Sequence, residues 1–356
     1  MAKIIYGVAG EGRGHSSRSR TIIEYLISQG HEVKIFTSRQ GYDYLNQFFD
    51  DVYDIFGLEL VFKEQDVDVF NTIKKNLDNA GNKGYKSLRE MIKVTNEFKP
   101  DFNITDFEPL VPFVSRLLNI PFYSINHQNF IFHSKLEYPR QWQNEFLKAS
   151  VVADGMYWFA KKYYVTSFYF PEIKKRFKDK AVIFGPVLRK EVLKQKVRDN
   201  NKILMYTTTP EAQKILKMFD NIDEEIVAYG FKDKKDTKNI KFKKPSTDGF
   251  LKDLAECKAV ITGGGYSLMS EALYLNKPIY SIPIKGQFEQ MINGYYLEKL
   301  NYGLYDLNPN KKRLMQFFDG LDFFRKNIKH SRKKFTGNKY IFKELKEIVK
   351  KHKKSA

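Results

Sequence analysis

The fold is decided near the start of the chain by residues 3–37, KIIYGVAGEGRGHSSRSRTIIEYLISQGHEVKIFT. An apolar run over residues 3–8 precedes a glycine-rich loop. Residues 16–29 then carry isoleucine and leucine at helical spacing until Gly30 ends the pattern, and a second apolar run covers residues 32–37. The order strand, loop, helix, strand is typical of a βαβ unit, which begins a parallel sheet.

The same alternation continues on both sides of a break near residues 184–202. Before the break, the pattern predicts helices at 85–98 and 110–118, strands at 102–105 and 121–125, and a long loop at 63–84. After it, the pattern predicts strands at 203–207, 225–229, 259–262 and 278–282 and helices at 211–218, 249–256, 267–275 and 290–300, the last ended by Gly303. We therefore expect two doubly wound, Rossmann-like α/β domains with a cleft between them.

The composition narrows the class of protein. Lys and Arg outnumber Asp and Glu by 61 to 42, which gives a formal net charge of +19. The single cysteine, Cys257, excludes an intrachain disulfide and a cysteine-rich zinc site, and fits a reducing compartment. No stretch is long and apolar enough to predict a membrane span or the core of a signal peptide. We expect a cytoplasmic protein.

Two segments hold most of the excess charge. Residues 311–356 contain 16 basic and four acidic residues, and residues 156–180 contain seven basic and two acidic residues among nine aromatic ones. Such patches bind nucleic acid or an anionic membrane, or are only solvated surface. The aromatic segment also reads as a good strand, so several of its rings should lie in a core.

The first candidate site is the loop GEGRGH at residues 10–15, between a strand and a helix. Glycine lets a backbone approach a ligand closely, and a helix start offers free N–H groups to an anion. The spacing fits neither the dinucleotide fingerprint nor a P-loop. His15 has the right side chain for a general base, or it only packs the turn.

Polar side chains also follow two later strands of the first half. Asp106 and Glu108 come after the strand at 102–105, and Asn126, His127 and Gln128 come after the next one. Carboxylates and histidine can take or orient a proton, although polar residues are also ordinary in turns. These positions should meet the Gly10–His15 loop at one sheet edge.

The second half has a matching loop, Gly263-Gly264-Gly265, which leads into a helix carrying Ser267 and Glu271. Three glycines before a helix favour a phosphate or ribose, and Glu271 could accept two ribose hydroxyls or only lie favourably near the helix start. One strand later come Gln287, Glu289 and Gln290, which suit sugar hydroxyls.

The order of these motifs resembles a GT-B glycosyltransferase. The motifs are the Gly-rich loop with His15, then Gly-Gly-Gly-x-Ser-x-x-x-Glu-Ala, Lys-Pro, Pro-x-x-x-Gln-x-Glu-Gln-x-x-Asn-Gly and Leu-x-x-x-Asn-Tyr-Gly, over residues 3–305. The chain is similar to the branch that contains the lipid-linked N-acetylglucosaminyltransferase of peptidoglycan synthesis and the plant galactolipid synthases. It looks closest to uncharacterised archaeal and bacterial homologues of that branch.

The resemblance implies an acceptor-binding domain over residues 1–186 and a nucleotide-sugar domain over residues 187–325. A basic helix or tail over residues 326–356 would cross back to the first domain. The implied catalytic candidates are His15, first, then Asp106, Glu108 and His127. The implied donor-binding residues are Gly12, Gly14, Thr207, Thr208, Gly264, Gly265, Ser267, Glu271, Gln287, Glu289 and Gln290. Thr207 and Thr208 depart from the Gly-Ser-rich phosphate loop usual at their position.

We accordingly expect inverting transfer of a sugar from a nucleotide-diphosphate donor, with UDP preferred, and with neither metal nor cofactor. The basic and aromatic segments suggest a lipid or lipid-linked acceptor and an anionic membrane surface at the inner face of the cell membrane. No nucleic-acid motif is present, so nucleic acid is not an expected partner. A nucleotide-sugar 2-epimerase and a non-catalytic sugar-binding module remain alternatives.

Overall fold

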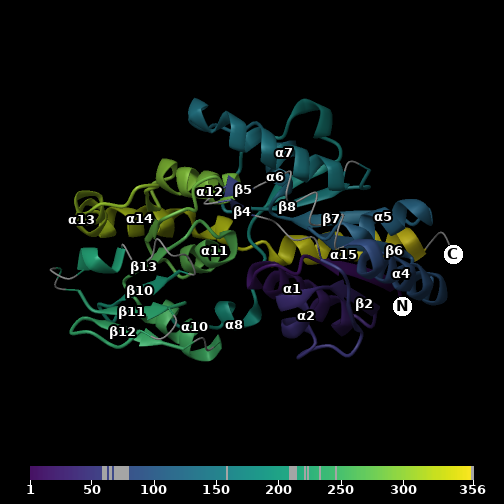
Figure 1. Cartoon of the computed structure of the whole chain (residues 1–356), viewed down its shortest axis with the longest axis horizontal. Coiled ribbons are helices and arrows are strands. Elements are labelled where there is room, and N and C mark those ends of the chain that lie inside the picture. Colours follow the sequence, from purple (N-terminus) through teal and green to yellow (C-terminus); the bar gives the residue numbers. More distant parts are fainter. Residues whose placement is uncertain are drawn as a thin grey trace. The chain divides into compact units, whose positions relative to one another are not determined.

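The computed structural model describes residues 1–57, 62–63, 66–67, 80–157, 159–207, 215–219, 222, 224–231, 234–244 and 247–353. The chain divides into two compact units (Figure 1). Unit 1 comprises Met1–Arg189 and Gly337–Ala356, and unit 2 comprises Lys190–Thr336. The final helix therefore belongs to the same unit as the first strand.

Unit 1 is built on a seven-stranded parallel sheet in the order β3-β2-β1-β6-β7-β8-β9. Its strands are β1 (Lys3–Val8), β2 (Glu32–Thr37), β3 (Val52–Asp54), β6 (Phe102–Asp106), β7 (Phe122–Asn126), β8 (Tyr163–Thr166) and β9 (Ala181–Phe184). A separate antiparallel pair joins β4 (Phe62–Lys63) to β5 (Asp66–Val67). The helices are α1 (Arg13–Ser28), α2 (Arg39–Leu45), η1 (Ala80–Gly84), α4 (Tyr85–Phe98), α5 (Leu110–Leu117), α6 (Asn129–His133), η2 (Arg140–Trp142), α7 (Gln143–Tyr157), η3 (Lys175–Phe177) and α15 (Asn338–Lys353).

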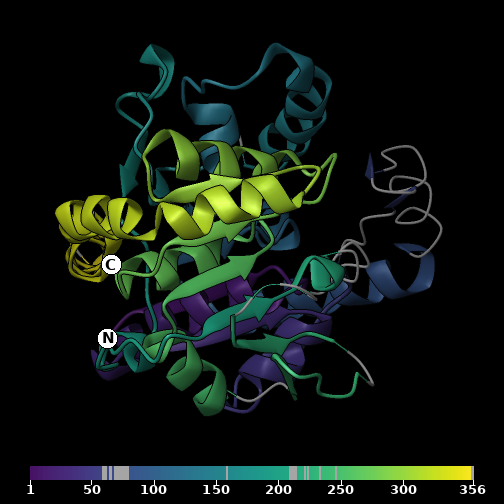
Figure 2. The same ribbon diagram turned by 90° about the vertical axis from the view of Figure 1, so that its left-hand side faces the viewer.

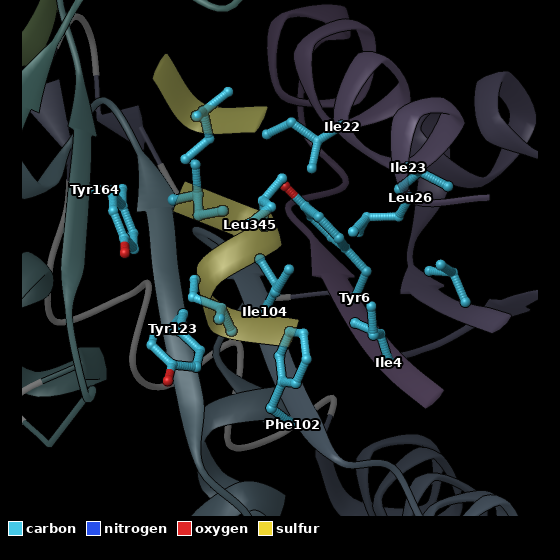
Figure 3. Close-up of a cluster of buried hydrophobic side chains, with 14 of the residues drawn as sticks. Ile4, Tyr6, Ile22, Ile23, Leu26, Phe102, Ile104, Tyr123, Tyr164 and Leu345 are labelled. Atoms are coloured by element: carbon cyan, nitrogen blue, oxygen red, sulfur yellow. The ribbon is translucent and has the colours of Figure 1, made fainter. Parts of the chain in front are cut away.

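Helices cover both faces of this sheet because side chains alternate along each strand. Ile4 and Tyr6 of β1 pack with residues of α1 and α15, whereas Ile5 packs on the other face with residues of α4 and α5. Figure 3 shows this buried cluster, in which Leu345 of α15 lies near Ile104 of β6 and Tyr6 of β1. The buried face of α15 makes it part of the unit 1 fold.

Specific polar contacts also fix α15. Glu344 accepts hydrogen bonds from Lys162 at 3.1 Å and from the Tyr164 hydroxyl at 2.9 Å. At the start of the helix, Asn338 makes two hydrogen bonds with the backbone of Leu188, at 2.9 and 2.7 Å. These hydrogen bonds, together with the buried apolar face, fix the position of α15.

Unit 2 is built on a six-stranded parallel sheet in the order β12-β11-β10-β13-β14-β15. Its strands are β10 (Ile203–Tyr206), β11 (Ile226–Tyr229), β12 (Ile240–Lys243), β13 (Ala259–Thr262), β14 (Ile279–Ser281) and β15 (Gly303–Tyr305). Its helices are α8 (Lys190–Leu193), η4 (Lys217–Phe219), α10 (Thr247–Glu256), α11 (Tyr266–Tyr274), α12 (Phe288–Lys299), α13 (Lys311–Asp319), α14 (Leu321–Ser331) and η5 (Arg332–Phe335). Phe317 of α13 and Phe324 of α14 belong to the buried apolar cluster of this unit, together with Ile203 and Tyr280 of the sheet. The two helices are yellow-green ribbons in Figure 2.

The prediction of two α/β units with parallel sheets is confirmed, and some details differ. Gly303 does not end a helix: α12 finishes at Lys299, Asn301 takes the left-handed conformation (φ 56°), and Gly303 begins β15. A Cβ on Gly303 would lie 1.8 Å from the Ile279 carbonyl oxygen, so close strand packing explains the glycine. β3, β9, β12 and β15 were not predicted. Most of the predicted 63–84 loop and residues 211–214 of a predicted helix lie outside the described residues.

Candidate functional site

Three loops of unit 1 meet at one edge of the sheet. β6 pairs with both β1 and β7, so the segments that follow these strands are neighbours. The carboxyl ends of parallel strands are where ligands bind in open α/β sheets. The residues after the three strands include His15, Phe107 and Gln128.

His15 and Asp106 are brought together at this edge. Nδ1 of His15 lies 2.8 Å from Oδ1 of Asp106. The Asp106 side chain is buried, whereas 15% of the His15 side chain stays exposed. The ring of Phe107 is stacked against the imidazole, with centroids 6.0 Å apart. Asp106 therefore holds the imidazole on its buried side, and part of the ring stays accessible to solvent.

Asp106 has further partners on α1. Arg18 donates from Nε to Oδ2 at 2.7 Å and from Nη2 to Oδ1 at 2.6 Å, and the Ser19 hydroxyl donates to Oδ2 at 2.9 Å. Burial alone would raise the pKa of Asp106, but the charges of Arg18 and His15 outweigh it and hold the pKa at about 2. Asp106 is a carboxylate at neutral pH.

The hydrogen bonds of His15 assign a role to each ring nitrogen. A carboxylate can only accept, so in the tautomer that carries its proton on Nδ1 the ring donates to Asp106. The side-chain amide nitrogen of Gln128 lies 3.2 Å from Nε2 and can donate to its lone pair. Nε2 is thus the nitrogen that could take a proton from a bound molecule, in the manner of a general base.

The glycine-rich loop is partly open and partly packed. Gly12 adopts a left-handed φ of 74°, and a Cβ there would meet nothing within 4 Å. Gly10 instead packs against Ser38, whose carbonyl oxygen would lie 2.3 Å from an added Cβ. Gly14 lies inside the first turn of α1, where its carbonyl accepts from the Ser17 hydroxyl at 3.3 Å. Gly12 is the position that leaves room for a ligand.

Glu108 does not face His15. Its two carboxylate oxygens accept the backbone N–H groups of Leu110 and Val111, both at 2.8 Å, and so cap the start of α5. Burial raises the pKa of Glu108 to about 7, and the two backbone hydrogen bonds partly oppose the rise. The geometry gives Glu108 a structural role in place of the predicted role as a base.

His127 is fully buried, and its side chain contacts residues of the unit 1 core. Its Nδ1 is 2.8 Å from the Thr166 carbonyl oxygen, to which it donates. Its ring packs against Phe130, with centroids 4.5 Å apart, and edge-on against Tyr169. His127 therefore belongs to the core, and its neighbour Gln128 is the residue that reaches His15.

In unit 2, the predicted donor loops also follow adjacent strands, β10, β13 and β14. Thr207 follows β10 directly, and its backbone N–H bonds to the Tyr229 carbonyl oxygen at 3.3 Å. Thr208 lies outside the described residues. Gly265 precedes α11 and is exposed, and a Cβ there would meet nothing within 4 Å.

Gly264 is buried and contacts Gln290, which is half-buried. Oε1 of Gln290 accepts the backbone N–H groups of Gly264 and Ile284, both at 3.2 Å, and its Nε2 donates to Oε1 of Gln287 at 2.5 Å. Asn293 donates to the Gly264 carbonyl at 2.9 Å. Gly264 is therefore pinned at both backbone groups, and Gln290 braces the two loops from inside.

The remaining donor candidates lie on α11 and α12. Ser267 is half-buried in the first turn of α11, and Glu271, one turn later on the same helix, is 6% exposed. Glu289 is half-buried in the first turn of α12. Neither helix start has a side-chain cap. The start of α11 also lacks an acidic residue, so it suits an anion better than that of α12.

Three roles were missed from the sequence. Arg18 and Ser19 sit in the polar run RGHSSRSR, which resembles a solvated helix start, and Asn293 sits inside a helix. The spacing of His15 and Arg18 is the only signal in the sequence, because residues three apart share a helix face.

Within the described ranges, no group of three His, Cys, Asp or Glu side chains could hold a metal ion. In the same part of the chain, no helix is long and apolar enough to cross a membrane.

Two units, each built on a parallel α/β sheet, form the architecture of the GT-B class of glycosyltransferases. Residues 2–322 match the family described as glycosyl transferase family 1, and the chain belongs to this family. It is 26% identical over 338 residues to an uncharacterized glycosyltransferase of Methanosarcina mazei, covering 85% of this chain and 84% of that protein. A Methanosarcina acetivorans glycosyltransferase is 24% identical over 337 residues, covering 85% and 84%.

The fold is similar to those of solved glycosyltransferases. The glycotransferase of kitacinnamycin has a TM-score of 0.69 at 14% identity and covers 97% of this chain and 98% of its own. Streptomyces sp. SF2575 glycosyltransferase SsfS6, complexed with thymidine diphosphate, has a TM-score of 0.65 at 13% identity and covers 98% and 100%. The chain is a glycosyltransferase enzyme of GT-B fold.

Proposed function

We propose that the protein transfers a sugar from a nucleotide-diphosphate donor to an acceptor hydroxyl, with inversion and without metal. The hydrogen bond between His15 and the buried Asp106 carries the proposal, because it leaves Nε2 of an accessible imidazole as a proton acceptor. SsfS6 complexed with thymidine diphosphate and a UDP-glucosyltransferase from Polygonum tinctorium support the donor class. UDP is the preferred carrier in this proposal.

The proposed step balances as a displacement at the sugar. The acceptor oxygen attacks the anomeric carbon, its proton passes to Nε2 of His15, and the bond from that carbon to the diphosphate oxygen breaks. The nucleotide diphosphate leaves with the bonding electron pair. Asp106 keeps Nδ1 oriented and stabilises the imidazolium that forms.

The proposed donor contacts in unit 2 differ in kind. Gly265 and Ser267, at the open start of α11, would bind the diphosphate through N–H and hydroxyl groups. Thr207 would add a hydroxyl, Glu271 would hold the ribose, and Glu289 would contact the sugar. Gln290 and Gly264 act by shaping the loops, because their polar groups are engaged within the protein.

A donor screen tests the proposal. Nucleotide sugars in excess over Kd should raise the apparent Tm, since a ligand that binds only the folded state adds RT ln(1 + [L]/Kd) to stability. Transfer should then be sought with the donor that binds. Binding with acceptor-free isomerisation would indicate a 2-epimerase, and binding without any turnover would indicate a sugar-binding module.

We further propose a lipid or lipid-linked acceptor met at an anionic membrane surface, such as the inner face of the cell membrane. The exposed face of α15 carries Lys339, Lys343, Lys346, Lys350 and Lys351. Each basic residue near an anionic surface contributes about 1 kcal/mol. The apolar face of α15 is packed in the unit 1 core, so attraction by charge is the mechanism proposed.

The aromatic segment adds little to such an anchor. Tyr163, Tyr164, Phe168 and Tyr169 are buried, whereas Phe170 is exposed.

Deleting α15 would remove core residues, so the test of membrane binding uses charge reversal. Lys343→Glu, Lys346→Glu and Lys350→Glu together should abolish binding to phosphatidylglycerol vesicles, with three exposed α14–η5 residues, Lys326, Lys333 and Lys334, reversed as the matched control. Equal binding by the α15 triple variant and the wild type would contradict the proposal.

A further inference from the structure

Arg18 is a buried cation one helical turn after His15. It is 4% exposed, and both its Nε and its Nη2 donate to the carboxylate of Asp106. Such a two-point contact between guanidinium and carboxylate is among the strong hydrogen-bonded pairs in proteins. The carboxylate behind His15 is therefore shared between an imidazole and a permanent positive charge.

This sharing changes what Asp106 does to His15. A carboxylate alone beside an imidazole favours the protonated ring, because opposite charges attract. Nη2 of Arg18 lies 2.7 Å from the same Nδ1 of His15 that faces Asp106. In the tautomer whose Nδ1–H donates to Asp106, this is a contact between two donors, and in either tautomer a charged imidazolium would lie against a cation.

Among the described residues, the other side chains that hydrogen-bond to Asp106 or His15 carry no charge. The Ser19 hydroxyl donates to Oδ2, and the side-chain amide of Gln128 faces the far nitrogen of His15. Burial, and then the charge of Asp106, raise the pKa of Tyr6 on β1, so its phenol is neutral. The carboxylate of Glu108 is bonded to the start of α5. Arg18 is thus the cation that sets the balance at this site.

We propose that Arg18 is a positioning residue that keeps Asp106 ionised and limits how strongly that carboxylate holds a proton on His15. The consequence is an imidazole whose protonated form the carboxylate stabilises less than it would in a simple histidine–carboxylate pair, because Asp106 is shared with a permanent positive charge. The catalytic part of this inference rests on the proposed role of His15 as base.

The direct test follows the proton titration of His15 by NMR, which needs no substrate. Removing the guanidinium in Arg18→Met should raise the midpoint of the His15 titration by about one pH unit or more. Arg18→Gln, which retains a donor for Asp106 but no charge, should act in the same direction and serves where the Met variant does not fold. Arg18→Lys should restore part of the wild-type midpoint.

Arg20 supplies the matched control. It lies on the same helix and is equally buried, but it pairs with Glu24 at 2.7 Å and covers the Phe48 ring. Arg20→Met should leave the His15 midpoint unchanged. A folded Arg18→Gln or Arg18→Met protein with an unchanged or lowered midpoint would overturn the proposal, as would an equal rise in Arg20→Met.

The kinetic counterpart separates this inference from the proposed function. In Arg18→Gln, the acidic limb of kcat should move to higher pH while the Kd for the donor stays constant, because the proposed contacts to the diphosphate, ribose and sugar lie in unit 2. A wild-type protein with no transferase turnover would defeat the proposed function, yet the NMR titration would still decide the role of Arg18.

Discussion

Nδ1 of His15 and Oδ1 of Asp106 lie 2.8 Å apart although 91 positions separate the two residues in the chain. Parallel pairing of β1 with β6 places Val8 opposite Asp106, and the glycine-rich loop then turns the chain into α1 within a few residues. The pair is therefore a product of sheet topology, which is why it forms at the edge where ligands bind such sheets.

Replacing His15 by Ala should lower kcat by about 10²- to 10⁴-fold, the usual contribution of a positioned general base. Donor affinity, measured by calorimetry, should stay unchanged, because the proposed contacts to the diphosphate, ribose and sugar lie in unit 2. His330, exposed on α14, supplies the control, and its Ala variant should keep full activity. Normal turnover by the His15 variant would remove this residue from the mechanism.

Asp106→Asn should destabilise unit 1 at neutral pH, because Arg18 would be left buried without its counter-charge. The folded pKa of Asp106 is about 2, below its usual 3.8, so its stabilisation is complete above pH 3.8 and is lost as pH falls through 2. The shift corresponds to about 2 kcal/mol. Urea unfolding of both proteins at pH 7, 4 and 3 should show the gap narrowing with acid; a gap independent of pH would contradict the assignment.

Glu108 should show the opposite pH dependence, two residues further on. Its folded pKa of about 7 lies above the usual 4.5, so its contribution to stability is complete below pH 4.5 and is lost as pH rises through 7. Relative to Glu108→Gln, the wild type should lose about 3 kcal/mol between pH 4.5 and pH 7 or above. Denaturant unfolding at pH 5 and pH 8 measures the difference, and parallel curves for the two proteins would show that Glu108 is not buried as a titrating group.

The sequence was a good guide wherever a local pattern determines structure. The apolar periodicity of residues 3–37 predicted β1, α1 and β2, and the strand order then placed Asp106 near His15. It was a poor guide wherever a side chain is satisfied by a distant partner. Arg18 reads as a solvated arginine until β6 is seen beside it, and Glu108 reads as a candidate base until α5 is seen to begin on its carboxylate.

Gln290 shows the same limit in unit 2, since its side chain was predicted to bind sugar and instead braces the Gly264 and Ile284 loops. Gln290→Ala should leave two backbone N–H groups without an acceptor and cost about 1–3 kcal/mol of stability. Donor Kd should rise at the same time, because the loops would loosen. Glu289→Ala is the comparison: it should weaken binding of the nucleotide sugar, with little effect on the free nucleotide diphosphate or on Tm.

Gly264 and Gly265 are adjacent, yet their Ala variants should fail in different ways. A Cβ on Gly264 would lie 2.3 Å from the Gln290 carbonyl oxygen and 2.6 Å from its Cα, both backbone atoms, so Gly264→Ala should displace α12 and lower Tm. Gly265 has φ −67° and open space around it, so Gly265→Ala should fold with an unchanged Tm. Because the proposed diphosphate site is at this open helix start, Gly265→Ala should still raise the donor Kd. If the Gly265→Ala protein binds nucleotide diphosphate as tightly as the wild type, the proposed diphosphate site at the start of α11 is wrong.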